Sequence, residues 1–204
     1  ELMKNTITVM VILLCFQMCS FIALQTEADD SSLRVMSFNI YRGGTFLGQP
    51  LSQTAKVICK ANADIVGIQE TRSPDGVNAE RLAKLLGWNH YVNPRNRVVL
   101  TRYEIIERFR DGVKVKLPKE QMAYIFNLHL PSNPYQPYQL LNIRPKWHKH
   151  WDTPFIKTEA EAIAFAKLAR GGEVSTILNQ ISTLADRDVP VFVVGDFNEP
   201  SHLD

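Results

Sequence analysis

Asp196 and Asn198 stand two residues apart directly after an apolar run, and their side chains suit chemistry at a phosphate group. An Asp carboxylate can orient or deprotonate a water molecule, and an Asn carboxamide can donate a hydrogen bond to a phosphoryl oxygen. The preceding run, 191–194, is β-branched and aromatic, which is the pattern of a strand buried on both faces. Taken alone, these residues are explained more simply by a strand end followed by an Asx-type turn.

Three further polar residues lie at or near the ends of apolar runs. Asn39 ends Val-Met-Ser-Phe-Asn, Glu70 ends Ile-Val-Gly-Ile-Gln-Glu, and His129 lies in Phe-Asn-Leu-His-Leu. Singly, they are typical of a turn residue, a solvated strand end and a satisfied core histidine. Together they predict one site, in which Glu70 and Asn39 offer oxygen atoms to Mg²⁺ and the remaining groups act on a phosphate ester.

The elements that must position these residues follow from hydrophobic periodicity. Strands are expected over residues 33–41, 64–70, 97–101, 104–109, 113–117, 122–130 and 191–194. Helices are expected over 52–62, 78–86 and 158–170, and after a break at Gly171-Gly172 a further apolar stripe predicts another helix. Strands and helices interleave, with hairpins in the middle of the chain. This order predicts an α/β sandwich of two packed sheets with helices outside.

The first 28 residues differ from the rest of the 204-residue chain. Lys4 precedes a mostly apolar run, 7–24, so residues 1–28 are predicted to be a signal peptide. An uncleaved anchor through residues 6–24 is the alternative, since the run is close to the ~20 residues that span a bilayer. We therefore expect a secreted or periplasmic domain over residues 29–204. The net charge of +2 is too small to indicate a dedicated nucleic-acid binder.

The segment 131–157 is much longer than the ~4–6 residues of a typical connection. It begins two residues after His129 and is rich in aromatic and basic side chains. We interpret it as a specificity flap whose substrate-contacting candidates are Tyr135, Tyr138, Arg144 and Lys146. The alternative is a surface loop packed by its own aromatic side chains.

Five stretches of the chain, in order, resemble the endonuclease/exonuclease/phosphatase superfamily, which has the deoxyribonuclease-I-like fold. They are Leu33-Arg-Val-Met-Ser-Phe-Asn-Ile-Tyr41, Ala63-Asp-Ile-Val-Gly-Ile-Gln-Glu70, Val98-Val-Leu-Thr-Arg-Tyr103, Phe126-Asn-Leu-His-Leu130 and Val193-Val-Gly-Asp-Phe-Asn198. The resemblance implies a four-layer sandwich of two mixed β-sheets flanked by helices. It also implies a phosphoesterase that depends on Mg²⁺, with Mn²⁺ as a substitute. Cys59 is the only cysteine after residue 28, so a bacterial-type exported member without disulfides is expected.

The resemblance assigns a role to each candidate. Glu70 would be the principal metal ligand and Asn39 an additional one. His129 would bind or protonate the phosphate, Asp196 would orient the attacking water, and Asn198 would help to hold both.

The chain departs from the family pattern at two places. The segment 101–104 reads Thr-Arg-Tyr-Glu instead of Ser-Arg-x-Pro, and Arg102 within it would support the site as a structural residue. The family's last motif, Ser-Asp-His, has no counterpart up to Asp204. We therefore expect the last strands of the fold to be missing from these 204 residues, which would be inactive alone. The alternative is a catalytically inactive binding module on the same fold.

The expected partner is a phosphate-ester substrate. Nucleic acid, a phospholipid head group and a small phosphate ester remain open as substrate classes. No obligate protein partner is inferred.

Overall fold

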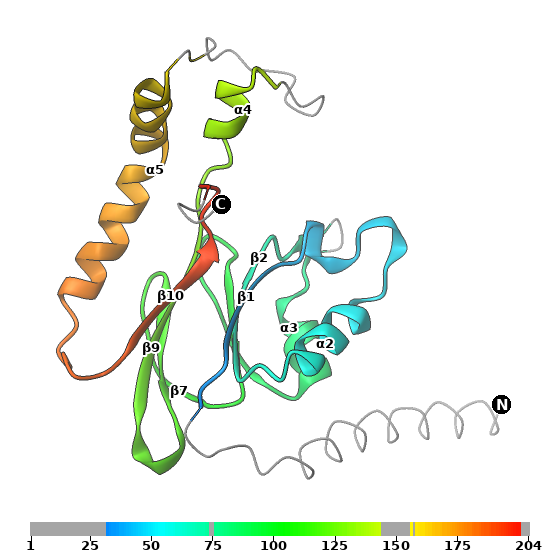
Figure 1. Ribbon diagram of the computed structural model, residues 1–204. Helices are drawn as coiled ribbons and strands as arrows, with labels where there is room; N and C mark the ends of the chain where they lie inside the picture. The colour runs from blue at the N-terminus through cyan, green and yellow to red at the C-terminus, as the bar shows by residue number, and fades with distance from the viewer. Residues whose placement is uncertain (1–31, 74–75, 144–155, 157, 201–204) are drawn as a thin grey trace.

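The computed structural model describes residues 32–73, 76–143, 156 and 158–200 (Figure 1). Within them, two four-stranded sheets face each other. The first has the order β1 (Val35–Asn39), β2 (Ile65–Gln69), β6 (Val98–Thr101), β5 (Asn89–Val92). The second has the order β10 (Val191–Asp196), β9 (Met122–His129), β8 (Gly112–Lys116), β7 (Glu104–Arg108). Each sheet combines one parallel pair, β1 with β2 or β10 with β9, with antiparallel neighbours.

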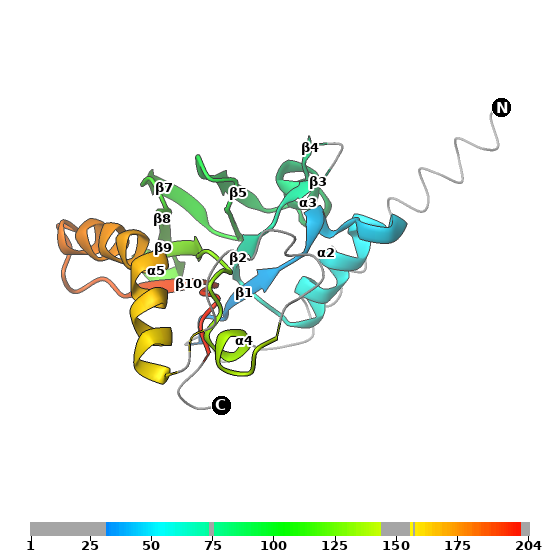
Figure 2. The ribbon, with the colours of Figure 1, turned by 90° about the horizontal axis from the view of Figure 1, so that it is seen from above.

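Helices cover the outer faces of both sheets. Figure 2 shows α2 (Leu51–Lys60) and α3 (Ala79–Leu86) beside the first sheet and α5 (Glu159–Ser182) beside the second. Buried apolar side chains fill three layers accordingly, one between the sheets and one under each helical cover. The predicted four-layer sandwich is confirmed. The remaining short elements are η1 (Arg42–Gly44), η2 (Phe46–Gly48), β3 (Arg72–Ser73), β4 (Gly76–Val77), η3 (Pro118–Glu120) and α4 (Gln136–Leu140).

The expected break in the last helix is wrong, because α5 continues through Gly171 and Gly172. Glycine costs about 1 kcal/mol relative to alanine in a helix interior, which is a modest penalty. The Thr158 hydroxyl caps the helix by accepting from the Glu161 N–H, and Ile177 is buried against the second sheet. Packing therefore outweighs propensity here. Of the helices within the described residues, none has the length and apolar character that a bilayer crossing requires.

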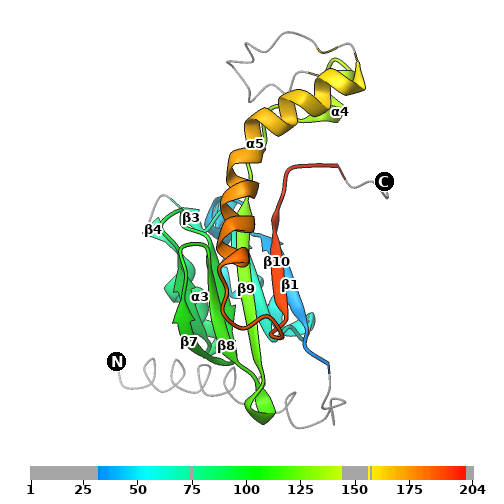
Figure 3. The same cartoon turned by 90° about the vertical axis from the view of Figure 1, so that its left-hand side faces the viewer.

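Strand β10 is also less buried than its sequence predicted. It lies at the edge of the second sheet, beside β9 (Figure 3). Phe192 and Val194 pack between the sheets, whereas Val191 and Val193 on the opposite face are 38% and 37% exposed. The prediction of burial on both faces is therefore wrong, since α5 covers the neighbouring strand rather than β10 itself.

A buried amide joins the two sheets. Asn127 on β9 donates to the carbonyl groups of Ile68 and Val98 in the first sheet, at 2.9 and 2.8 Å. Its Oδ1 accepts from Nε2 of Gln69 at 2.6 Å. Gly67 lies beside this link, where a Cβ would be 2.4 Å from Cγ2 of Val194 and 3.0 Å from the Asn127 side chain. These hydrogen bonds fix how the sheets are placed relative to each other.

We predict that Asn127→Leu destabilises the fold by about 3 kcal/mol, because it removes the partner of several buried polar groups. Chemical denaturation would measure the change in the free energy of unfolding. The control is Asn179→Leu on the exposed side of α5, which should change that free energy by less than about 0.5 kcal/mol. Equal effects of the two substitutions would contradict a role for Asn127 in joining the sheets.

Candidate active site

Four strands end at the same place in the molecule. Asn39 pairs with Gln69 at the end of the parallel β1–β2 pair, and Asp196 pairs with His129 at the end of the parallel β10–β9 pair. Since the two sheets face each other, the carboxyl ends of these strands converge (Figure 1). Asn39, Glu70, His129 and Asp196 are thereby brought together, as the sequence predicted.

Asn39 connects the two carboxylates of the cluster. Its Nδ2 donates to Oε1 of Glu70 at 3.0 Å and to Oδ2 of Asp196 at 2.9 Å. Its Oδ1 accepts from the backbone N–H of Tyr41 at 2.9 Å, which determines the orientation of the amide. Nε2 of His129 lies 3.8 Å from Oδ2 of Asp196 on the adjacent strand. The cluster therefore combines two carboxylates, one amide and one imidazole from both sheets.

Glu70 is held in an unusual backbone conformation, with φ at 57°. Its carbonyl accepts from the N–H of Gly43 at 2.7 Å, and its Oε2 accepts from the N–H of Arg42 at 3.3 Å. A left-handed conformation costs roughly 1–2 kcal/mol in a residue other than glycine. Such strain is commonly found at functional sites, where the surrounding structure maintains it. The loop after β1 thus orients the Glu70 carboxylate toward the cluster.

Asn198 closes a turn beside the cluster. Its backbone N–H donates to Oδ1 of Asp196 at 3.1 Å, and its Nδ2 donates to the Leu130 carbonyl at 2.8 Å. Asn198 therefore forms the Asx-type turn and also lies beside the cluster. The turn holds the Asp196 carboxylate in place. The role of Asn198 in holding phosphate stays a prediction.

The two carboxylates suit a divalent cation. Glu70 and Asp196 both lie within 3.0 Å of one nitrogen atom, and within the described residues no Lys or Arg forms an ion pair with either. A hard cation would relieve their mutual repulsion, and Mg²⁺ is commonly bound through one or two carboxylates with several retained waters. No three His, Cys, Asp or Glu side chains in the described part of the chain form a larger metal-binding group. Asn39 presents nitrogen rather than oxygen to the carboxylates, so its role as a metal ligand would require its amide to turn.

A cavity of about 740 Å³ opens on one side of the cluster. One wall comes from the turn after β10 and the other from the segment after β9, and the lining residues include Asn39, Gln69, Ser132, Tyr135, Tyr138, Asp196, Phe197 and Asn198. The rings of Tyr135 and Tyr138 pack edge to face, with centroids 5.1 Å apart. Two of the four flap candidates thus line the cavity, while Arg144 and Lys146 lie outside the described residues.

Arg170, which the sequence interpretation missed, joins the two walls of this cavity. It is buried on α5 and donates to the carbonyl groups of Pro131 and Pro134, at 2.9 and 2.8 Å. Its Nε pairs with the Glu199 carboxylate, which also accepts from Gln136. The available signal was its position on α5, since Arg170 falls on the same face as two buried alanines at four-residue spacing, Ala162 and Ala166.

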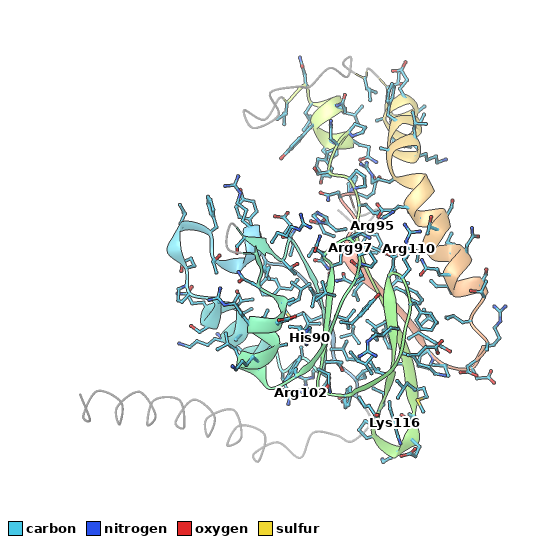
Figure 4. The ribbon with its side chains drawn as sticks, turned by 180° about the vertical axis from the view of Figure 1, so that it is seen from behind. His90, Arg95, Arg97, Arg102, Arg110 and Lys116 are labelled. Atoms are coloured by element: carbon cyan, nitrogen blue, oxygen red, sulfur yellow. The ribbon has the colours of Figure 1, made fainter. Side chains whose placement is uncertain are left out.

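A smaller cavity of about 290 Å³ lies on the other side, lined by Glu70, Thr71, Arg72, Arg95, Asn96, Arg97 and His129. Figure 4 shows Arg95 and Arg97 together at one end of the molecule, away from Arg102. Arg97 is only 7% exposed and donates to the His129 carbonyl at 2.7 Å. Burial, together with the neighbouring Arg95, lowers the pKa of the Arg97 guanidinium. The sequence analysis did not identify Arg95 and Arg97 as site residues, because the turn that leads into β6 has no recognisable periodicity.

Arg102 does not belong to this site. It follows β6 at the opposite end of the first sheet, and Figure 4 shows it far from Arg95 and Arg97. Its Nε donates to the Ala63 carbonyl at 3.1 Å, and its guanidinium lies 5.0 Å from the ring centroid of Trp88. The expected support of the site by Arg102 is wrong, because the residue anchors the start of β2 rather than its end.

Solved structures of other proteins superpose on the backbone of this chain. Mannosyl-6-phosphatase of Bacteroides thetaiotaomicron superposes with a TM-score of 0.52 at 14% identity, over 82% of this chain and 66% of that chain. The human nocturnin catalytic domain with bound sulfate gives a TM-score of 0.46 at 16% identity, over 81% of this chain and 64% of that chain. At such low identity, the first likeness concerns the fold alone.

Sequence comparison gives the family. An uncharacterized protein of Caenorhabditis elegans is 29% identical over 193 residues, which are 87% of this chain and 57% of that protein. This chain thus spans between 57% and 66% of the length of these three proteins. The Endonuclease/Exonuclease/phosphatase family model matches residues 36–204, from the first core strand to the last residue. The protein belongs to the Endonuclease/Exonuclease/phosphatase family.

Proposed function

We propose that the protein hydrolyses phosphate esters with the help of a divalent cation, Mg²⁺ or Mn²⁺. The observation that carries this proposal is the pairing of Glu70 and Asp196, from different sheets, across the Asn39 amide. Membership of the Endonuclease/Exonuclease/phosphatase family supports it. The similarity in fold to a mannosyl-6-phosphatase agrees with a phosphate ester as substrate. We further propose export through residues 1–28.

Each side chain has a task that follows from its contacts. Asp196 is held by the Asn39 amide and the Asn198 N–H, so its carboxylate is positioned to orient or deprotonate a water molecule. His129, beside Asp196, can donate a hydrogen bond to a phosphoryl oxygen. A cation bound at Glu70 would polarise the phosphoryl group as a Lewis acid. Pre-positioned groups of this kind stabilise the charge that develops in the transition state.

The metal requirement can be tested directly. Phosphodiester hydrolysis by the full-length protein should be lost in EDTA and restored by Mg²⁺ or Mn²⁺. Glu70→Gln keeps the size of the side chain but removes its charge, so it should lower activity and raise the Mg²⁺ concentration needed for half-maximal rate. Activity in EDTA equal to that in Mg²⁺ would refute the assignment.

The catalytic residues can be separated from structural ones. Asp196→Asn and His129→Ala should each lower kcat/KM roughly 10²-fold or more, with little change in Tm. Arg102→Gln, at the opposite end of the sheet, should lower Tm while leaving kcat/KM almost unchanged. If Asp196→Asn instead lowered Tm and kept full activity, Asp196 would be a turn residue without a catalytic role.

A further inference from the structure

The smaller cavity adjoins the catalytic cluster, and among the described residues it shares no lining residue with the larger one. Glu70 and His129 belong to its wall, together with three arginines, Arg72, Arg95 and Arg97. The larger cavity is lined by Asn39 and Asp196 from the same cluster. A phosphate group bound at the cluster would therefore have a separate cavity on each side.

The residues that line the smaller cavity include three arginines, Arg72, Arg95 and Arg97, and one carboxylate, Glu70. Glu173 pairs with both Arg95 and Arg97, and Asp111 lies 3.8 Å from Arg97. When the Asn96 amide oxygen faces Arg72, the Nη2 and Nε atoms of Arg72 donate to it at 2.8 and 3.0 Å. This partner is neutral. Among the described residues, Arg95 and Arg97 thus share the Glu173 carboxylate, Arg97 and Arg110 share the Asp111 carboxylate, and Arg72 has a neutral partner.

Hydrogen bonds hold the turn that carries Arg95 and Arg97, whereas Arg72 lies on β3. Oδ1 of Asn93 accepts from the backbone N–H groups of Arg95 and Arg97, both at 2.9 Å. The Thr71 hydroxyl donates to the Asn96 carbonyl at 2.6 Å. Because the cavity wall is already fixed, binding of an anion there would cost little conformational entropy. Guanidinium groups also match the geometry of phosphate oxygens, with which they form paired hydrogen bonds.

We propose that this cavity binds a second phosphate group of the substrate, next to the phosphate that is cleaved. The inference rests on the proposed function, and it narrows the substrate class to phosphate esters that carry another phosphate nearby. Arg95 and Arg72 are the specificity-determining residues. Arg97 is a positioning residue, because it is buried and holds the His129 carbonyl.

Calorimetric binding of a matched ligand pair tests this proposal. Thymidine bisphosphate, with phosphates at both sugar hydroxyls, and thymidine 5′-monophosphate would be titrated at fixed Mg²⁺ into the Asp196→Asn variant, in which hydrolysis is blocked. A charge-assisted contact predicts roughly tenfold tighter binding of the bisphosphate. Arg95→Gln should remove most of this preference and leave the affinity for the monophosphate unchanged, and Arg72→Gln should show the same pattern.

The matched control is Arg110→Gln, made in the same background. Arg110 lies at the same end of the molecule in Figure 4, is 53% exposed and lines neither cavity, so its loss should keep the preference. Equal weakening of both ligands by Arg95→Gln, or an equal effect of Arg110→Gln, would overturn the proposal. So would equal affinity of the starting protein for the two ligands.

Hydrolysis by the unsubstituted protein separates the two conclusions. If the protein hydrolyses a chromogenic phosphodiester but binds thymidine bisphosphate no more tightly than the monophosphate, only the anion cavity is rejected. Selective binding of the bisphosphate without any hydrolysis would reject the catalytic proposal and retain the anion cavity.

Discussion

The arrangement of the site depends on the hydrogen bonds that Asn127 forms across the interface between the sheets. Apolar packing between two sheets is non-directional and would tolerate sliding, whereas these bonds are directional and buried. Gln69 immediately precedes Glu70, and Asn127 lies two residues before His129. A buried polar group left without its partners is costly, so the sheets have one strongly preferred placement. That placement brings a carboxylate of one sheet opposite the imidazole and carboxylate of the other.

Two buried arginines extend this control to the chain that follows β9. Arg97 binds the carbonyl of His129 from the side of the first sheet, and Arg170 binds the carbonyls of Pro131 and Pro134 from α5. The segment that leaves the strand is therefore held from both directions. One side of the cluster has an aromatic and polar cavity, and the other has a cationic one, so the site is chemically asymmetric.

The sequence predicted the elements that bury their apolar faces and the polar residues at their ends, because periodicity reports both directly. Asn39, Glu70, His129 and Asp196 converge since the ends of parallel strands meet at one edge of each sheet. The sequence could not place Arg102, because a strand pattern does not tell which end of a sheet a flanking residue reaches. The helix break predicted at Gly171-Gly172 was wrong for a related reason. Local helix propensity is a weak guide where packing holds a helix together.

Arg170 binds backbone carbonyls in the segment after β9, and this has an evolutionary consequence. Every residue type supplies a carbonyl, so these two contacts, unlike the contacts of Arg170 with Gln136 and Glu199, do not depend on which side chains the segment carries. Residues such as Tyr135 and Tyr138 can be exchanged while the attachment of the segment to the domain stays the same. The fold thereby separates the part of the cavity wall that can diversify from the part that must be retained.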